Sequence, residues 1–268
     1  MGFISLDTLI GIILGFGLFG YSIFISTDNY AMFLSLPSLL MVIGGTIAAT
    51  MISYQGRYVM IALKEMGSIL IHQAINPKTL FADVKRVIGW ATIIKSKGIS
   101  GLEEDLEQNK TDDPYVLYAA ELLSTGYKSH QVRQLLTDFM ESTFERSLVP
   151  ANIVTTMATY APAFGMIGTL VGLIIMLDNL GGDASELGKG LSIALMTTLY
   201  GVLFAQLVCK PASLKITQKH EIIRFRNTLL MEGFVLLADK ADAIVIQDKM
   251  NSFLAPKAHF SVLDDGDN

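Results

Sequence analysis

The sequence is poor in charge and in cysteine. Of its 268 residues, 17% are charged and 51% are hydrophobic, a balance too apolar for an ordinary soluble domain. A single cysteine, Cys209, excludes an internal disulfide framework, and its apolar neighbours favour a packing role. None of the four histidines lies in an apolar run, and isolated histidines are usually surface residues, so we expect no zinc-type metal site. The net charge of −5 gives no indication of a nucleic-acid partner.

Charged residues are missing altogether from four long segments. A membrane helix needs about 20 apolar residues, and the segments that reach this length are Thr8–Thr27, a span within Met32–Tyr54, Ala151–Leu177 and Gly190–Cys209. The first lacks the basic leader and the cleavage site of a signal peptide, so we interpret it as a permanent helix. The sequence therefore predicts an all-α integral membrane protein with four transmembrane helices.

Lys and Arg are distributed unevenly around these segments. Residues 55–150 carry eleven of the 20 and the tail from Lys210 carries eight, which leaves only Lys189 for the other loops. Basic residues concentrate on the cytoplasmic side of membrane proteins, so both segments and both termini are predicted to be cytoplasmic. The predicted domains are 1–54 for transmembrane helices 1 and 2, 55–150 for a cytoplasmic helical domain, 151–211 for transmembrane helices 3 and 4, and 212–268 for a helical cytoplasmic tail with a disordered end.

The predicted cytoplasmic domain has helical periodicity and no convincing alternating strand pattern. Breaks between its helices are expected at residues 76–77, 98–101 and 108–114, where Gly, Pro, Asn and Asp gather. One apolar face at helical spacing is formed by Val132, Leu135, Leu136, Phe139, Met140 and Phe144.

Small residues line one face of the third membrane helix and recur along the fourth. In a membrane such stripes let two helix backbones approach closely, so we interpret these residues as helix-packing positions. The stripe on the third helix comprises Ala161, Gly165, Gly168 and Gly172, and its counterpart on the fourth comprises Gly190, Ala194, Gly201 and Ala205.

Hydroxyl groups form a second stripe on the third helix. Thr155, Pro162 and Thr169 are spaced by seven residues and therefore share a face. Pro162 removes a backbone donor and loosens the carbonyl near residue 158, which membrane proteins tolerate only against protein or water. Thr197 and Thr198 place two hydroxyls at similar depth on the fourth helix. A membrane threonine often bonds only to its own helical turn, but several beside a proline favour a partner helix or a wet pathway.

The four uncharged segments contain no Asp, Glu, Lys, Arg or His. An ion pathway normally needs an ionisable group at membrane depth, so either the protein carries no ion or another subunit supplies the carboxylate. In the second case, hydroxyls and loosened carbonyls could act as neutral oxygen ligands for a hard cation such as sodium. No other cofactor is indicated.

Several blocks of the sequence, in this order and spacing, resemble the A subunit of the bacterial flagellar stator, the MotA/PomA family. The most specific blocks are APAFGMIGTLVGL and MTTLYG, and the resemblance covers nearly the whole chain. The MTTLYG block lies within LGKGLSIALMTTLYGVLFAQLVCKP (187–211), and the other blocks are LDTLIGIILGFG (6–17), LPSLLMVIGGTIAA (36–49) and LLMEGFVLL (229–237).

The resemblance implies a torque-generating subunit that is not an enzyme and that lies in the bacterial inner membrane. It implies a ring of five A subunits around two B subunits of the MotB/PomB type, which bring the membrane aspartate and a peptidoglycan anchor. Cation flow through this complex would rotate the A ring and turn the rotor through its switch protein FliG, in flagellar motility and chemotaxis.

By the same resemblance, individual residues acquire expected roles. Pro162 and Pro211 match the prolines that couple ion passage to movement of the cytoplasmic domain. Thr169, Thr197 and Thr198 match the hydroxyls of a sodium-type ion site, so Na⁺ is the expected ion and H⁺ the alternative. Two positions differ from some sodium-type members, which carry Asp where this chain has Ser35 and Thr159.

The family's rotor-facing motif has its counterpart in KSKGISGLEEDLE (95–107). The resemblance assigns rotor contact to Lys95 and Lys97 and to the acidic pair Glu103 and Glu104. The plainer interpretation of such a charge run is a solvated helix face. Exposed charge pairs are worth only ~0–1 kcal/mol each, which suits a contact that must form and release repeatedly.

Three other functions fit the sequence less well. Energisers of the ExbB/TolQ type look like three-span proteins with the N-terminus outside. The four uncharged segments and the Lys/Arg distribution of this chain argue against that topology. An intramembrane hydrolase needs an activated nucleophile, and Ser192 has no intramembrane His or Asp to activate it. A passive scaffold would not explain the stripe formed by Thr155, Pro162 and Thr169.

Overall fold

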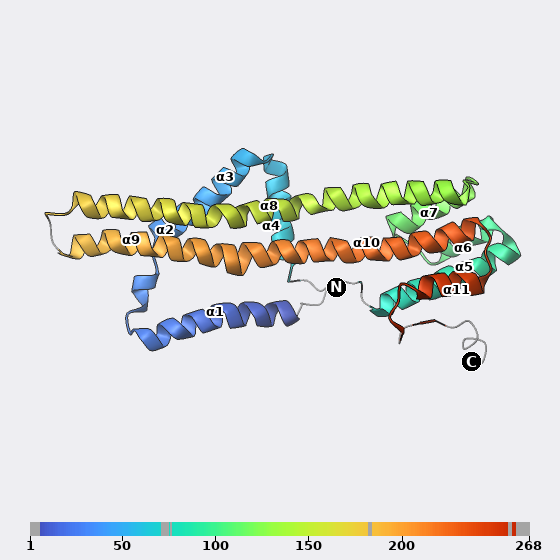
Figure 1. The fold of residues 1–268 in the computed structure, drawn as a ribbon, viewed down its shortest axis with the longest axis horizontal. Helices are drawn as coiled ribbons and strands as arrows, with labels where there is room; N and C mark the ends of the chain where they lie inside the picture. Colours follow the sequence, from blue (N-terminus) through green and yellow to red (C-terminus); the bar gives the residue numbers. More distant parts are fainter. Residues whose placement is uncertain (1–5, 71–74, 76, 182–183, 257–258, 261–268) are drawn as a thin grey trace. The chain divides into compact units, whose positions relative to one another are not determined.

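The computed structural model describes residues 6–70, 75, 77–181, 184–256 and 259–260, and this part of the chain is helical with no strand (Figure 1). The chain divides into two units. The first joins Met1–His72 with Ser147–Gln218, and the second joins Gln73–Arg146 with Lys219–Asn268. Each unit is thus built from two separate stretches of sequence. The predicted domain boundaries at 54, 150 and 211 are boundaries along the sequence and remain predictions.

The first unit contains the apolar helices. Its elements are α1 (Leu6–Ser26), the 3₁₀ turn η1 (Tyr30–Phe33), α2 (Leu36–Leu39), the π-helix η2 (Leu40–Gly44), α3 (Gly45–Ser53), α4 (Gly56–Ser68), residues 147–178 of α8 (Ser129–Asp178), α9 (Ala184–Leu203), the π-helix η3 (Phe204–Cys209) and the start of α10 (Lys210–Ala238).

Four helical segments of the described residues are long and apolar enough to cross a membrane. They are Leu6–Ser26, Tyr30–Ser53, and parts of the long helices Ser129–Asp178 and Leu187–Ala238. This confirms the four predicted spans and makes the chain a multi-pass membrane protein. The α1 helix has no buried residue, so its Leu, Ile and Phe side chains are free to face lipid or another subunit. The third and fourth spans continue as helix far beyond their uncharged segments.

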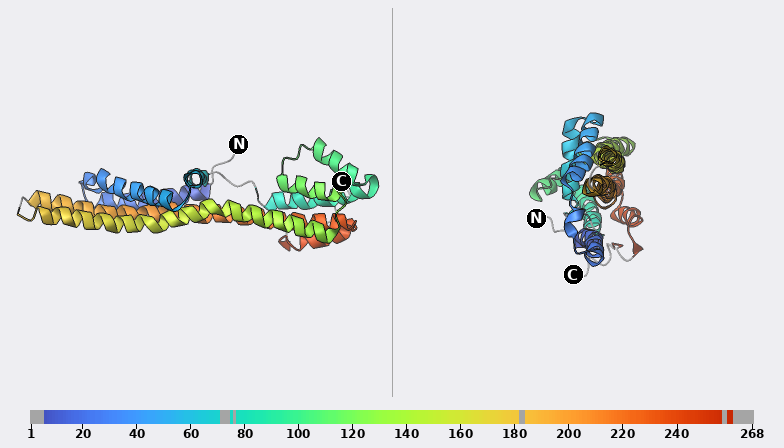
Figure 2. Two further views of the ribbon diagram at one scale, coloured as in Figure 1. Left: turned by 90° about the horizontal axis from the view of Figure 1, so that it is seen from above. Right: turned by 90° about the vertical axis from the view of Figure 1, so that its left-hand side faces the viewer.

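The α8 and α9 helices run side by side in opposite directions, as Figures 1 and 2 show. Glycine permits this approach. A Cβ atom built on Gly172 would lie 2.6 Å from the backbone nitrogen of Ala194, and one built on Gly201 would lie 2.7 Å from the carbonyl oxygen of Ala161. Real Cβ contacts are not this short, so these positions admit no side chain while the helices keep this distance.

Tyr200 of α9 contacts the start of the second span, between η1 and α2. Its hydroxyl donates to the carbonyl of Phe33 and accepts from the backbone nitrogen of Ser35 at 3.0 Å. The Ser35 side chain in turn caps α2 by accepting from the backbone nitrogen of Ser38. Together these contacts satisfy polar backbone groups at a helix end, which is necessary where water is scarce.

The second unit has an apolar core of its own. Its elements are α5 (Pro77–Lys97), α6 (Ile99–Gln108), α7 (Pro114–Ser124), residues 129–146 of α8, residues 219–238 of α10, and α11 (Ala243–Asn251). Trp90 and Phe234 lie at the centre with ring centroids 5.5 Å apart, and both are almost fully buried. The α11 helix packs on α5. The helices of this unit confirm the predicted all-α class, and its core draws on both the middle segment and the tail. The disordered end predicted for the tail concerns residues 261–268, which lie outside the described residues.

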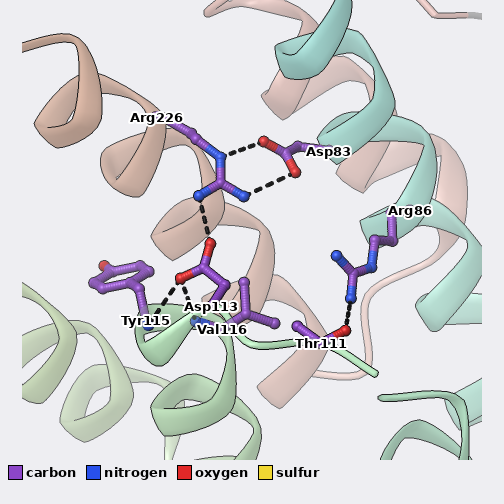
Figure 3. A network of polar contacts seen from close by, with 7 residues as sticks. All are labelled: Asp83, Arg86, Thr111, Asp113, Tyr115, Val116 and Arg226. Atoms are coloured by element: carbon purple, nitrogen blue, oxygen red, sulfur yellow. Dashed lines mark hydrogen bonds and ion pairs between the residues drawn. The ribbon is translucent and has the colours of Figure 1, made fainter. Parts of the chain in front are cut away.

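A largely buried arginine, whose side chain is 16% exposed, joins three helices of the second unit (Figure 3). Arg226 of α10 binds Asp83 of α5 through two guanidinium nitrogens and contacts Asp113 through a third. Asp113 is also the N-cap of α7, where its other oxygen accepts from the backbone nitrogen of Tyr115 at 2.9 Å. One guanidinium therefore ties α5 and the start of α7 to α10.

Candidate functional site

Two threonines on neighbouring helices meet in the first unit. Thr169 Oγ1 lies 3.1 Å from the carbonyl oxygens of both Gly165 and Ala194, and it hydrogen-bonds Thr198 Oγ1. Thr198 Oγ1 also lies 3.5 Å from the Gly165 carbonyl. The structure therefore gathers two hydroxyls and two carbonyl oxygens within one turn of α8 and α9. These are neutral oxygen ligands of the kind that hard cations accept.

Thr197 is turned away from this pair. Its side chain is fully buried, and its hydroxyl donates within α9 to the carbonyls of Ile193 and Ala194 at 3.0 and 2.9 Å. It packs against Gly168, where an added Cβ would come within 2.5 Å of the threonine side chain. Thr197 connects to the Thr169–Thr198 pair only through the shared Ala194 carbonyl. Of the three hydroxyls that the sequence singled out, two are in direct contact and one supports them.

The two prolines occupy different settings. Pro162 lies inside the continuous helix α8, and its Cα is 3.3 Å from the position of a Cβ added to Gly201. Pro211 is the second residue of α10 and lies two residues after the end of the π-helix η3. Because a proline inside a helix donates no hydrogen bond to the carbonyl four residues earlier, Pro211 leaves the Leu207 carbonyl without its helical donor. A wide π-turn at this point is consistent with that loss.

The remaining glycines of the small-residue stripe face α9. A Cβ added to Gly165 would lie 3.0 Å from the Thr197 carbonyl oxygen, closer than nearly all real Cβ contacts. The close approach of α8 and α9 therefore depends on the same short stretch that carries Thr169. The roles of Thr169, Thr197 and Thr198 in an ion pathway and of Pro162 and Pro211 in coupling stay predictions.

The charged hairpin of the second unit is formed by the end of α5 and the start of α6. Gly98 makes the turn with φ of 75°, a value that favours glycine. Lys97 Nζ lies 3.7 Å from a carboxylate oxygen of Glu104, and Glu103 accepts from the Ser124 hydroxyl at 2.6 Å. These side chains are exposed, in line with either rotor contact or a solvated face.

Lys95 has a partner that the sequence did not indicate. Its Nζ lies 2.8 Å from a carboxylate oxygen of Asp242, the N-cap residue of α11, and the two side chains are 79% and 72% exposed. The hydrogen bond from Lys95 lowers the pKa of Asp242, and the same bond raises the pKa of Lys95. The pairing is therefore constant from about pH 5 to about pH 9, and weakens as the pH falls below or rises above that window.

We expect this ion pair to add nothing measurable to folding. Lys95→Met and Asp242→Asn should leave the urea midpoint of the second unit unchanged at neutral pH, because the charges are solvated and screened. Trp90 is the only tryptophan of the chain and is buried in this unit, so its fluorescence in the detergent-solubilised protein reports the transition. A clear fall of the midpoint in either variant would contradict the expectation.

Comparison with known proteins agrees with the geometry. The MotA/TolQ/ExbB proton channel family matches residues 107–226. The chain is 30% identical to the chemotaxis protein PomA of Vibrio alginolyticus over 93% of this chain and 95% of that protein. The chain belongs to the MotA/TolQ/ExbB proton channel family. This is a family of channel and motor subunits rather than of enzymes.

Full-length similarity places the chain in the MotA/PomA group of this family. It is 29% identical to motility protein A of Borreliella burgdorferi over 94% of this chain and 95% of that protein. The fold also matches a chain of the C. jejuni MotAB structure with a TM-score of 0.85 at 20% identity, covering 96% of this chain and 99% of that one. At this identity the structural match establishes the MotA fold alone.

Several contacts within the two units were not visible in the sequence. Ser213, Tyr200 and Arg226 each bond to residues more than 50 positions away. Arg226 carries no local signal, since Arg224 stands two residues before it and has only exposed contacts. Ser213 and Tyr200 carry no local signal either.

Proposed function

We propose that this chain is the A subunit of a flagellar motor stator that couples sodium flow through the inner membrane to rotation of the rotor. The observation that carries the proposal is the Thr169–Thr198 pair, which offers neutral oxygens in membrane spans whose uncharged segments lack any acid. The full-length similarity to proteins named for motility and chemotaxis supports the flagellar assignment.

A B subunit of the MotB/PomB type completes the proposed site. The neutral oxygens of Thr169 and Thr198 require a carboxylate to hold a cation at membrane depth, and a membrane aspartate of the B subunit supplies it. The exposed side of Thr198 is open to such a helix. We propose a ring of five A subunits around a B dimer that is anchored to peptidoglycan, with both termini of the A subunit in the cytoplasm.

The hairpin around Gly98 is the proposed contact with the rotor protein FliG. Lys95, Lys97, Glu103 and Glu104 present both signs of charge on exposed side chains. Exposed ion pairs are individually weak, so contacts of this kind can form and break as the ring turns. Lys95, the first of these charges, lies beside Asp242 of α11.

Motor speed against external sodium at fixed pH tests the proposal. The cells should lack other stators and carry this chain with its cognate B subunit. Speed is expected to rise and saturate with sodium, and Thr169→Val is expected to raise the half-saturating sodium concentration about tenfold, because one oxygen ligand is lost. Thr169→Ser keeps the hydroxyl and serves as the matched control.

The other outcomes decide between the alternatives. A motor speed that is independent of sodium but falls with a proton uncoupler would support the stator assignment and identify H⁺ as the transported ion. A complex that is present in the membrane without any rotation would favour an energiser of the ExbB/TolQ type. Equal sodium curves for Thr169→Val and the unaltered chain would remove Thr169 from the site.

A further inference from the structure

The arrangement around Thr169 and Thr198 occurs a second time in the first unit. We call the set of Thr169, Thr198 and the Gly165 carbonyl the outer cluster, and the set of Thr155, Ser213 and the Ala151 carbonyl the inner cluster. In the inner cluster, Thr155 Oγ1 and Ser213 Oγ lie 3.0 and 2.9 Å from the Ala151 carbonyl oxygen and 2.6 Å from each other. Each cluster joins an α8 threonine, a hydroxyl of the facing helix and the carbonyl one turn before that threonine.

The spacing of the two clusters shows how the repeat arises. On α8, Thr155 and Thr169 are 14 residues apart, close to four full turns, so both face the same way about 21 Å apart. On the facing helix, Thr198 and Ser213 are 15 residues apart, which is one residue more than the 14 that separate Thr155 from Thr169. The π-helix η3 lies between them, and a π-turn accommodates one extra residue. The wide turn therefore brings Ser213 into register with Thr155.

Each cluster has one exposed residue, which lies on α8 in the inner cluster and on α9 in the outer cluster. Thr155 and Thr198 are exposed, whereas Ser213 is only 5% exposed and Thr169 is partly buried. Each cluster thus presents one accessible hydroxyl and one sheltered hydroxyl. In the proposed stator, the accessible hydroxyls would face the helices of the B subunit.

The hydroxyls of the inner cluster have oxygen lone pairs to spare. Each hydroxyl has one proton and two lone pairs, and Thr155 and Ser213 contact each other and the Ala151 carbonyl. One proton bonds the carbonyl and the other bonds the neighbouring hydroxyl, which leaves at least one lone pair free on each side-chain oxygen. Oxygen lone pairs fixed in this way replace part of the hydration shell of a small cation.

We propose that the inner cluster is a second station for the transported cation, where a sodium ion regains water at the cytoplasmic end of its path. This rests on the proposed function. Ala151 is the first residue of the uncharged segment of the third span, so the inner cluster lies at the predicted cytoplasmic end of that span. The nearby Lys215 is directed elsewhere, since its Nζ donates to Thr8 of α1 at 2.7 Å. The competing interpretation is that the two hydroxyls only hold α8 against α10.

The test compares motor speed against external sodium for Thr155→Val and Ser213→Ala, with this chain and its B subunit in cells that lack other stators. Loss of an exit station slows ion release, so the plateau speed is expected to fall about fivefold. The half-saturating sodium concentration is expected to change less than about twofold, unlike that of Thr169→Val. Speeds are normalised to the amount of assembled complex in the membrane.

Two control variants separate the station from packing. Thr155→Ser retains the hydroxyl and should restore the plateau. Thr156→Val removes a hydroxyl from the same turn whose contacts are with Asn152 and Tyr54, and it should leave the normalised curve unchanged. An equal loss in Thr156→Val would overturn the proposal in favour of packing.

The remaining outcomes distinguish this proposal from the proposed function. Variant curves that coincide with that of the unaltered chain, when that chain is driven by sodium, would overturn the inner station and leave the stator assignment intact. An unaltered chain whose speed ignores sodium would overturn sodium coupling, and the second sodium station with it.

Discussion

Gly190→Ala is expected to separate α9 from α8 and to abolish motor rotation. A Cβ on Gly190 would lie 2.8 Å from the backbone nitrogen of Met176 and 2.9 Å from the carbonyl oxygen of Gly172. Backbone atoms cannot rotate away as a side chain can, so the helices must move apart. Overpacking of this kind costs about 1–3 kcal/mol even where side chains yield, and the displacement also pulls Thr198 away from Thr169.

Gly188→Ala is the matched control for this prediction. Gly188 lies two residues earlier on the same helix, and an added Cβ meets no atom within 4 Å. Since alanine stabilises a helix by about 1 kcal/mol relative to glycine, this variant should be as stable as the unaltered chain or slightly more. The thermal midpoint of the purified stator complex, together with rotation in cells, measures both variants. Equal behaviour of the two would contradict the close packing of α8 and α9.

Arg226→Met is expected to unfold the second unit at much lower urea concentrations. Asp83 is only 8% exposed, and without Arg226 its carboxylate would be left buried and unpaired. Removing one partner of a buried ion pair costs about 3–5 kcal/mol, which corresponds to a fall of about 2 M in the urea midpoint. The expected consequence in cells is loss of torque, because α5 carries one side of the charged hairpin and is no longer fixed to α10.

Arg224→Met supplies the comparison on the same helix. Arg224 lies 3.5 Å from Glu141 and stacks over Phe144, but both charged side chains are more than 40% exposed. Exposed contacts of this type are worth about 1 kcal/mol, so its midpoint should change little. Trp90 fluorescence follows both variants in the solubilised chain. A double variant, Arg226→Met with Asp83→Leu, should recover part of the loss, because no buried charge at position 83 remains unpaired.

The membrane part shows which features spacing alone reveals. The uncharged segments predicted the four spans because lipid excludes charge over a fixed thickness, wherever the helices pack. The seven-residue spacing predicted that Thr155, Pro162 and Thr169 share a face of α8, because the helical period does not depend on neighbours. The same reasoning could not choose between Thr197 and Thr198, since adjacent residues point about 100° apart and only the packing of α9 on α8 decides which is buried.

Some charged contacts of the second unit could not be predicted from spacing within one segment. Lys95, Lys97, Glu103 and Glu104 were recognised as a group because they lie close in the sequence. The contacts of Arg226 with Asp83 and Asp113 span more than 100 residues. No local pattern specifies such partners, because many acids could reach an arginine in an unfolded chain and only the assembled core selects two of them.

The amino-acid sequence by itself determined the four membrane spans, the helical class of the remaining chain, the family resemblance and the shared face of the α8 threonines. These follow from composition and helical periodicity, which act within one segment. Only the tertiary structure decided that Ser213 meets Thr155, that Arg226 joins α5 and α7 to α10, and that Thr197 is buried. Each of these depends on how the segments pack against one another, and the π-turn of η3 shifts the register of the fourth span by one residue.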